Sequence, residues 1–236
     1  MTAFPDTRVS AIQRAASDDA RVRAAAQDTV AEVYWAPICA YIRLTHRALR
    51  EDAEDLTQGF FADALRRGVF ARYEPGRARF RTFMRRCVDR FVINARKAEG
   101  RLKRGGEARL VSIDDALLAS RLAVEADPER LFHEEWVRSV FAVAVGRFRE
   151  RAVARGRHTH VALFERYDLD GSATGSPPSY AALASEFGLS VSQVTNWLAA
   201  ARREFREIVL DVLRELTGSV EEFREEARAL LGIDAT

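Results

Sequence analysis

Few residues in this sequence have the types and spacing that covalent catalysis or metal binding requires. Of the four histidines, His46 and His133 stand alone, and only His158 and His160 are close together. Two nearby imidazoles without a third ligand make a weak metal site. The sequence also has no nucleophile elbow, P-loop, dinucleotide fingerprint or HExxH motif. We therefore expect no catalytic residue, no metal site and no cofactor, and the chain is not expected to be an enzyme.

Arginine side chains supply the clearest chemistry, which is the binding of phosphates. Between Arg77 and Arg104 there are eleven Lys or Arg residues and only two acids, whereas from Gly105 to Glu135 eight acids oppose three arginines. The whole chain has a net charge of only +2, so its charge is sorted into blocks. A solvated helix face is one interpretation of the basic block. Because acidic partners at i+4 spacing are missing and aromatic residues such as Tyr73 lie beside it, we favour a nucleic-acid-binding surface.

A second candidate for nucleic-acid binding is the segment Ser179–Phe205. Ala184 is small enough for two helices to cross closely, Gly188 follows at the turn, and Ser190 can cap the next helix. This spacing is typical of a helix-turn-helix, although an ordinary αα-corner has a similar pattern. The DNA contacts would come from residues that the second helix exposes and from the arginines that flank them. These residues are Ser192, Gln193, Thr195, Asn196, Arg202, Arg203 and Arg206.

Helices must position both segments. Apolar residues recur at helical spacing through most of the chain, and strand-like alternation is absent. The clearest case is the basic block itself, in which Phe80, Met84, Cys87, Val88 and Phe91 share one face. We predict an all-α protein with two helical domains joined by a linker.

Breaks in this periodicity give the expected domain boundaries. Gly105 and Gly106 begin a stretch of low periodicity, and Asp127 followed by Pro128 is a typical helix start. The predicted parts are an N-terminal helical extension (1–24), a first domain (25–104), a linker (105–126), a second domain (127–216) and a C-terminal tail helix (217–236).

Composition points to the cytoplasm. The chain has 236 residues, and its two cysteines, Cys39 and Cys87, fall in apolar-periodic stretches, as expected for buried thiols in a reducing compartment. Its apolar runs are far shorter than the roughly 20 residues that span a bilayer. The first ten residues, MTAFPDTRVS, do not resemble an export signal. We expect a cytoplasmic protein without a membrane partner.

Three motifs in this order resemble those of bacterial extracytoplasmic-function sigma factors of RNA polymerase. The acidic segment Asp52–Gln58 (DAEDLTQ) is similar to sigma region 2.2, Phe80–Lys103 to regions 2.3 and 2.4, and Ser179–Arg206 to region 4.2. The resemblance covers roughly residues 25–216. It implies a region 2-like bundle, a region 4-like helix-turn-helix domain, and core RNA polymerase and promoter DNA as partners.

The resemblance also implies roles for individual residues. The region 2.2 helix would dock on the clamp helices of the polymerase through Asp52, Glu54, Asp55 and Gln58, although these acids could also simply complement the helix dipole. Region 2.4 and the turn before it, where the family captures a flipped base, would contact the −10 element. The residues expected there are Tyr73, Arg77, Arg79, Arg81, Arg85, Arg86, Arg90, Asn94 and Lys97. The helix-turn-helix would read the −35 element.

The sequence departs from the family pattern at two places. Gly59 occupies a helix position that is usually Glu, which costs about 1 kcal/mol of helix propensity relative to Ala and removes one clamp-facing charge. Thr195–Ala200 replaces a stretch that is usually rich in Lys and Arg, so a weak −35 contact is expected. Within it, Trp197 is expected to pack inside its domain.

Two further stretches, Phe91–Glu99 and Asp127–Trp136, look more like a branch of larger sigma factors found beside Ser/Thr kinases. That likeness implies a Ser/Thr kinase, or an anti-sigma factor, as a further partner. Thr57 is the candidate phosphorylation site, where added negative charge would strengthen acidic docking.

Two other functions remain open. A stand-alone helix-turn-helix regulator would bind a palindromic site as a dimer, but it leaves the acidic segment Asp52–Asp55 unexplained. A sigma-like adaptor that has lost promoter binding would fit the arginine-poor recognition helix.

Overall fold

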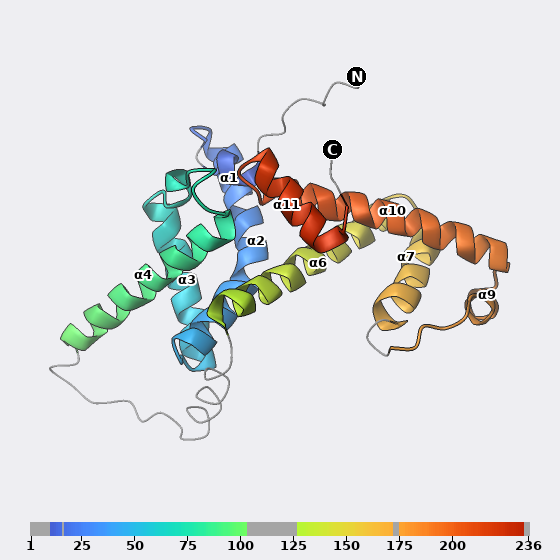
Figure 1. Cartoon of the computed structure of the whole chain (residues 1–236), viewed down its shortest axis with the longest axis horizontal. Coiled ribbons are helices and arrows are strands. Elements are labelled where there is room, and N and C mark those ends of the chain that lie inside the picture. The colour runs from blue at the N-terminus through green and yellow to red at the C-terminus, as the bar shows by residue number, and fades with distance from the viewer. Residues whose placement is uncertain (1–9, 16, 103–126, 172–174, 234–236) are drawn as a thin grey trace. The chain divides into compact units, whose positions relative to one another are not determined.

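Every regular element is helical in the residues that the structure describes. The computed structural model (Figure 1) describes residues 10–15, 17–102, 127–171 and 175–233. The expected all-α class is confirmed over these ranges. None of the helices in them combines the length and apolar character needed to cross a bilayer. The predicted linker, 105–126, lies outside the described residues.

The chain divides into two compact units, and each is described by itself. Unit 1 comprises residues 1–139 and 213–236, and unit 2 comprises residues 140–212. This division differs from the predicted boundaries, because the first turns of α6 (Pro128–Ala154) and the whole of the tail helix α11 (Val220–Leu231) belong to unit 1.

Aromatic packing explains why the beginning of α6 belongs to unit 1. The ring of Phe132 meets that of Tyr41 edge-on, with centroids 5.6 Å apart, and lies 6.4 Å from the ring of Tyr34. Trp136, one turn later, is only 1% exposed. Burying large apolar side chains of this kind contributes about 1.5–3 kcal/mol each. The helix expected to open the second domain therefore completes the core of the first unit.

The rest of unit 1 is formed by the N-terminal helices and the last helix. Its other elements are α1 (Ala11–Arg14), α2 (Ala20–Thr45), α3 (Arg50–Arg66), a 3₁₀ turn (Phe70–Arg72), α4 (Phe80–Leu102) and the end of α10 (Val191–Glu215). The start of α2 is fixed by Asp19, whose carboxylate accepts hydrogen bonds from the backbone N–H groups of Arg21 and Val22.

The basic helix α4 packs into unit 1 through a single apolar face. Phe80, Met84, Val88 and Val92 recur every four residues and are completely buried. Because residues four apart lie one turn apart on the same side of a helix, this row confirms the face predicted from the sequence. The arginines of α4 consequently occupy the remaining sides of the helix.

α3 and α4 approach each other closely at Gly59. A Cβ atom on Gly59 would lie 3.2 Å from Cζ of Phe91, so there is no room for a longer side chain unless that ring moves. Residue 59 therefore faces α4. The structure gives this glycine a packing role against Phe91.

Unit 2 contains the rest of α6 and the helix-turn-helix. Its other elements are α7 (His158–Phe164), a π-helical turn (Glu165–Leu169), α9 (Tyr180–Phe187) and α10 as far as Val212. A compact cluster of buried side chains joins α7, α9 and α10, and its members are Leu163, Leu183, Ala184, Val194 and Leu198.

Candidate nucleic-acid interface

α9 and α10 form a helix-turn-helix in unit 2. The Ser179 hydroxyl caps α9 by accepting a hydrogen bond from the Ala182 N–H, and Gly188 ends this helix in the left-handed conformation, with φ 64°. Ser190 and Gln193 then form a reciprocal capping box, in which each side chain accepts a hydrogen bond from the other's backbone N–H. The turn and caps expected from the sequence are confirmed.

The packing of this motif also matches its predicted pattern. Ala184 is 8% exposed where the two helices cross, and Val194 and Leu198 are completely buried beneath α10. Trp197 is half-buried and stacks on the ring of His160, with centroids 4.2 Å apart. The expectation that Trp197 packs inside its domain is confirmed. Burial lowers the pKa of His160, and the nearby charge of Arg157 lowers it further.

One face of α10 is exposed and polar. At about 100° per residue, six positions fall within an arc of about 100° on the side opposite Val194 and Leu198. All six are exposed, and they are Ser192, Thr195, Asn196, Ala199, Arg203 and Arg206. Gln193 lies beside this arc, with its carbonyl oxygen held by the capping box. Five of the seven residues predicted for the −35 contact thus share one accessible face.

Arg202 is held within unit 2. Its Nε lies 3.0 Å from both carboxylate oxygens of Asp168, and its guanidinium lies 5.1 Å from the centre of the Tyr167 ring. The hydrogen bond to Asp168 raises the pKa of Arg202. The cation is already paired, so contact with a DNA phosphate would require Arg202 to leave Asp168.

The C-terminal part of α4 is a second exposed cationic face, which we call the open half. Arg86, Arg90, Asn94 and Lys97 are exposed and lie within about 80° of one another around the helix. Ile93, 47% exposed, lies among them. Within the described part of the chain, no ion pair or hydrogen bond reaches these four polar side chains. They could therefore contact phosphates or bases without breaking an internal pair.

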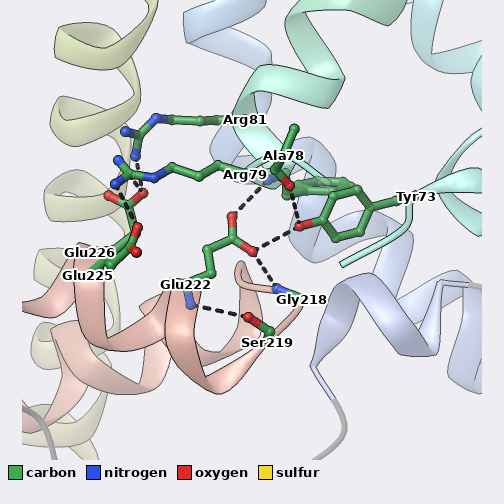
Figure 2. Close-up of polar contacts among 10 residues, drawn as sticks. Tyr73, Ala78, Arg79, Arg81, Gly218, Ser219, Glu222, Glu225 and Glu226 are labelled. Carbon is green, nitrogen blue, oxygen red and sulfur yellow. Dashed lines mark hydrogen bonds and ion pairs between the residues drawn. The ribbon is translucent and has the colours of Figure 1, made fainter. Parts of the chain in front are cut away.

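The remaining predicted −10 residues lie ahead of Arg86, and we call this region the covered half. Its members are Tyr73, Arg77, Arg79, Arg81 and Arg85. Each makes a polar contact within unit 1, and three of them contact acidic residues of α11 (Figure 2). The structure therefore divides the predicted −10 surface into an engaged part and an exposed part.

Glu222 of α11 is bound at the start of α4. Its carboxylate accepts hydrogen bonds from the Phe80 N–H at 2.7 Å, the Tyr73 hydroxyl at 3.0 Å and the Gly218 N–H at 2.8 Å (Figure 2). A carboxylate at a helix N-terminus is stabilised by the unpaired N–H groups and the helix dipole. Burial, reinforced by the charge of Glu222, raises the pKa of Tyr73 well above its ordinary value, so the phenol remains a donor.

Arg79 and Arg81 pair with the next turn of α11. Arg79 lies 2.7 Å from Glu225 and 3.3 Å from Glu226, while Arg81 contacts Glu226 directly (Figure 2). The other side of the Arg81 guanidinium lies 5.3 Å from the centre of the Trp136 ring. Glu226 is only 1% exposed, so its pair with Arg81 is largely desolvated, whereas Arg79 and Glu225 remain in contact with solvent.

The other two members of the covered half make weaker contacts. Arg77 is exposed and pairs with Glu74 at 3.0 Å, while Arg85 lies 3.5 Å from Glu129. Because Glu74 and Glu129 are both well exposed, these pairs contribute little and are easily exchanged for a phosphate.

The acidic face of α3 differs by one residue from the predicted polymerase-binding set. Glu54, Asp55 and Gln58 are exposed and share one side of the helix with Glu51, whereas Asp52 is half-buried beside it. Sequence reasoning therefore missed Glu51, although helical phase could have identified it. The exposed faces of Leu65 and Trp35, which are 42% and 40% exposed, add apolar surface in this unit.

Thr57 does not have the exposure that a phosphorylation site needs. It is completely buried, and its hydroxyl donates a 2.7 Å hydrogen bond to the Ala53 carbonyl. A kinase could not reach this hydroxyl, and a phosphate would not fit among the core residues. The suggestion of regulation at Thr57 is corrected accordingly.

The residues that sequence reasoning missed are Glu222, Glu225 and Glu226. The spacing of Ser219 and Glu222 signals a capping box, and Ser219 does cap α11. Nothing in that local signal indicates that Glu222 also reaches the start of α4, more than 140 residues earlier in the chain. Comparison with known proteins adds no family, because no family model, curated protein or solved structure matches this chain.

Proposed function

We propose that this chain is a sigma-type transcription initiation factor that binds core RNA polymerase, recognises −10 and −35 promoter elements and helps to open the DNA. The observation that carries the proposal is the sorting of charge between two adjacent helices of unit 1. The exposed face of α3 displays carboxylates and an amide, whereas the open half of α4 displays cations and an amide. Such surfaces suit two partners of opposite charge, a basic protein surface and a nucleic acid.

The helix-turn-helix of unit 2 supplies the remaining part of this function. Its exposed face offers Asn196 for base edges and Arg203 and Arg206 for bases or phosphates. In the proposed mechanism α10 holds duplex DNA, while α4 binds the strand that is separated. No covalent step by this chain is needed, because binding of unpaired nucleotides offsets the cost of unstacking them. Such a factor would act in the cytoplasm, on the nucleoid.

The acidic face of α3 gives the first test. In a binding assay with purified core polymerase from the source organism, neutralising Glu51, Glu54 and Asp55 as Gln or Asn should weaken binding about ten- to hundredfold. The matched control neutralises Glu150, Glu186 and Glu207, three exposed acids of unit 2, and should bind normally. Equal affinity of both variants, or no binding by the natural chain, would refute the proposed docking.

An adaptor that binds polymerase without promoter DNA is the second candidate. The observation that favours it is the engagement of Tyr73, Arg79 and Arg81 by α11. Both functions predict binding to core polymerase. Run-off transcription separates them, since only a sigma factor would produce new start sites.

A further inference from the structure

The tail helix α11 places carboxylates on side chains that the proposed function assigns to the −10 element. Glu222 accepts from Tyr73 and from the first N–H of α4, and Glu226 binds Arg79 and Arg81 (Figure 2). Both carboxylates are at least nine-tenths buried. While they are in place, they occupy the Phe80 N–H and the Tyr73 and Arg81 side chains, and Arg79 is paired with both Glu225 and Glu226.

The same donors form a site that suits phosphate. A free N–H at a helix N-terminus, a phenol hydroxyl and two guanidinium groups are groups that bind phosphate oxygens. Glu222 and Glu226 therefore bring to Tyr73, Arg79 and Arg81 the kind of charge that a nucleic-acid backbone would bring. The unpaired open half begins one helical turn further along α4.

We propose that α11 is an intramolecular competitor of nucleic acid, whose carboxylates fill the anion-binding site at the start of α4 until the helix is displaced. This inference rests on the proposed function and adds regulation at the same site. In the docked state the chain binds a DNA strand through the open half alone. Displacement of α11 adds Tyr73, Arg79 and Arg81 to the contact.

Three features of the docked helix and of the segment that leads into it are consistent with displacement. One carboxylate oxygen of Glu226, Oε2, is buried without a hydrogen bond from any described residue, so part of the cost of desolvating this charge is uncompensated. The apolar packing of α11 is limited, since Phe223 and Ala227 are the buried apolar residues of the helix itself. The segment that leads into α11 also passes extremely close to Tyr73, because a Cβ atom on Gly218 would lie 2.3 Å from Cε1 of that ring.

The first test compares two single neutralisations on the same helix. Glu226→Gln removes the charge that faces Arg79 and Arg81, whereas Glu221→Gln removes an exposed charge one turn away. Affinity of the full chain for a fluorescent single-stranded oligonucleotide is measured by anisotropy at several salt concentrations. We expect about three- to tenfold tighter binding for Glu226→Gln and less than about twofold for Glu221→Gln.

The salt dependence of oligonucleotide binding measures how many phosphate contacts a variant gains. Glu226→Gln frees Arg81 while Arg79 keeps Glu225, so the slope of log K against log salt should steepen by about 0.7, the value for one phosphate contact to a single strand. Adding Glu225→Gln frees Arg79 as well and should bring the change to about 1.4. Adding Arg79→Gln and Arg81→Gln to Glu226→Gln should remove both the gain in affinity and the steeper slope. General charge repulsion would instead give the two single variants equal affinities and unchanged slopes.

A substitution that leaves the charge unchanged tests displacement directly. Gly218→Ala forces the entry to α11 away from Tyr73, so it should also tighten oligonucleotide binding, and circular dichroism would verify that the helices are retained. Equal binding by Glu226→Gln, Glu221→Gln and the natural chain would overturn the inference and leave the proposed function standing. Absence of oligonucleotide binding by every variant, including the natural chain, would refute both.

Discussion

The covered half and the open half both carry arginines, but these arginines differ in their availability to a ligand. Arg81 in the covered half lies between Glu226 and the Trp136 ring, whereas Arg86 and Arg90 in the open half meet no acid among the described residues. All three arginines belong to one basic stretch of the sequence. What separates them is α11, which approaches only the first turns of α4. The number of arginines in a helix therefore does not indicate how many of them can bind DNA.

The same contrast recurs within one turn of α10. Arg202 is paired with Asp168, while Arg203, the next residue, is exposed on the face that carries Asn196. In both helices an ion pair formed through the fold removes an arginine from the accessible surface. Three experiments test this contrast, and a fourth tests the lowered pKa of two histidines.

The largest expected effect is loss of DNA binding from the open half. Arg86→Gln combined with Arg90→Gln should weaken binding of a single-stranded oligonucleotide about ten- to hundredfold at low salt, and it should lower the salt slope by about 1.4. The control pair, Arg21→Gln with Arg43→Gln, removes the same charge from exposed positions of α2. If the control pair weakens binding equally, the open half has no special role.

In the covered half, the expected effect of a substitution is on stability, because its side chains are engaged within unit 1. Glu222→Ala leaves the buried Phe80 and Gly218 N–H groups without their acceptor, whereas the Tyr73 hydroxyl keeps the Ala78 carbonyl. The substitution should destabilise unit 1 by about 2–3 kcal/mol. Urea unfolding followed by tryptophan fluorescence in a Trp197→Phe background reports on unit 1, because the other tryptophans, Trp35 and Trp136, lie there. Glu221→Ala, at an exposed position, should change the unfolding free energy by less than about 0.5 kcal/mol. A Glu222→Ala protein as stable as the control would contradict the contact.

The pair of arginines on α10 should separate stability from binding. Arg202→Gln breaks a partly exposed ion pair and should cost unit 2 about 1 kcal/mol, with little effect on DNA affinity. Arg203→Gln should leave stability unchanged and weaken binding to promoter duplex several-fold. Thermal unfolding and gel-shift titration check the two effects. If Arg202→Gln instead weakened DNA binding and Arg203→Gln lowered stability, Arg202 would have to leave Asp168 and bind DNA.

The smallest expected effect is a loss of stability at acidic pH. Burial lowers the pKa of both His133 in unit 1 and His160 in unit 2, helped by Arg81 and Arg157 respectively. The unfolded chain then binds protons more readily than the folded one. The stabilising contribution is therefore complete above the ordinary histidine pKa of about 6.5 and is lost as pH falls through the lowered folded-state values. His133→Gln and His160→Gln should each flatten the pH dependence of the unfolding free energy, and an unchanged profile would contradict these shifts.

Features with a local cause were predicted correctly from the sequence. The apolar row of α4, the turn at Gly188 and the cap at Ser190 depend on residues at most a few turns apart, and all are confirmed. The same periodicity could have corrected two predictions, since helical phase places Thr57 on the core face of α3 and Glu51 on its exposed face.

Features that depend on distant contacts were not predictable in this way. Glu222 meets Phe80 and Tyr73 across more than 140 residues, and no local pattern in α11 indicates that partner. The boundary after Ser139 has the same origin, because Phe132 follows a typical helix start and yet packs against Tyr41 of the first unit. The basic face of α4 could be predicted from the sequence, but its division into covered and open halves required the structure.

Run-off transcription with purified core polymerase tests the proposed function most directly. Fragmented genomic DNA of the source organism serves as template, and transcript 5′ ends are sequenced with and without this chain. We predict a set of new start sites with the natural chain, and their loss with Arg86→Gln and Arg90→Gln combined. A natural chain that binds the polymerase and yields no new start sites would contradict initiation by this protein and would leave the adaptor as the surviving candidate.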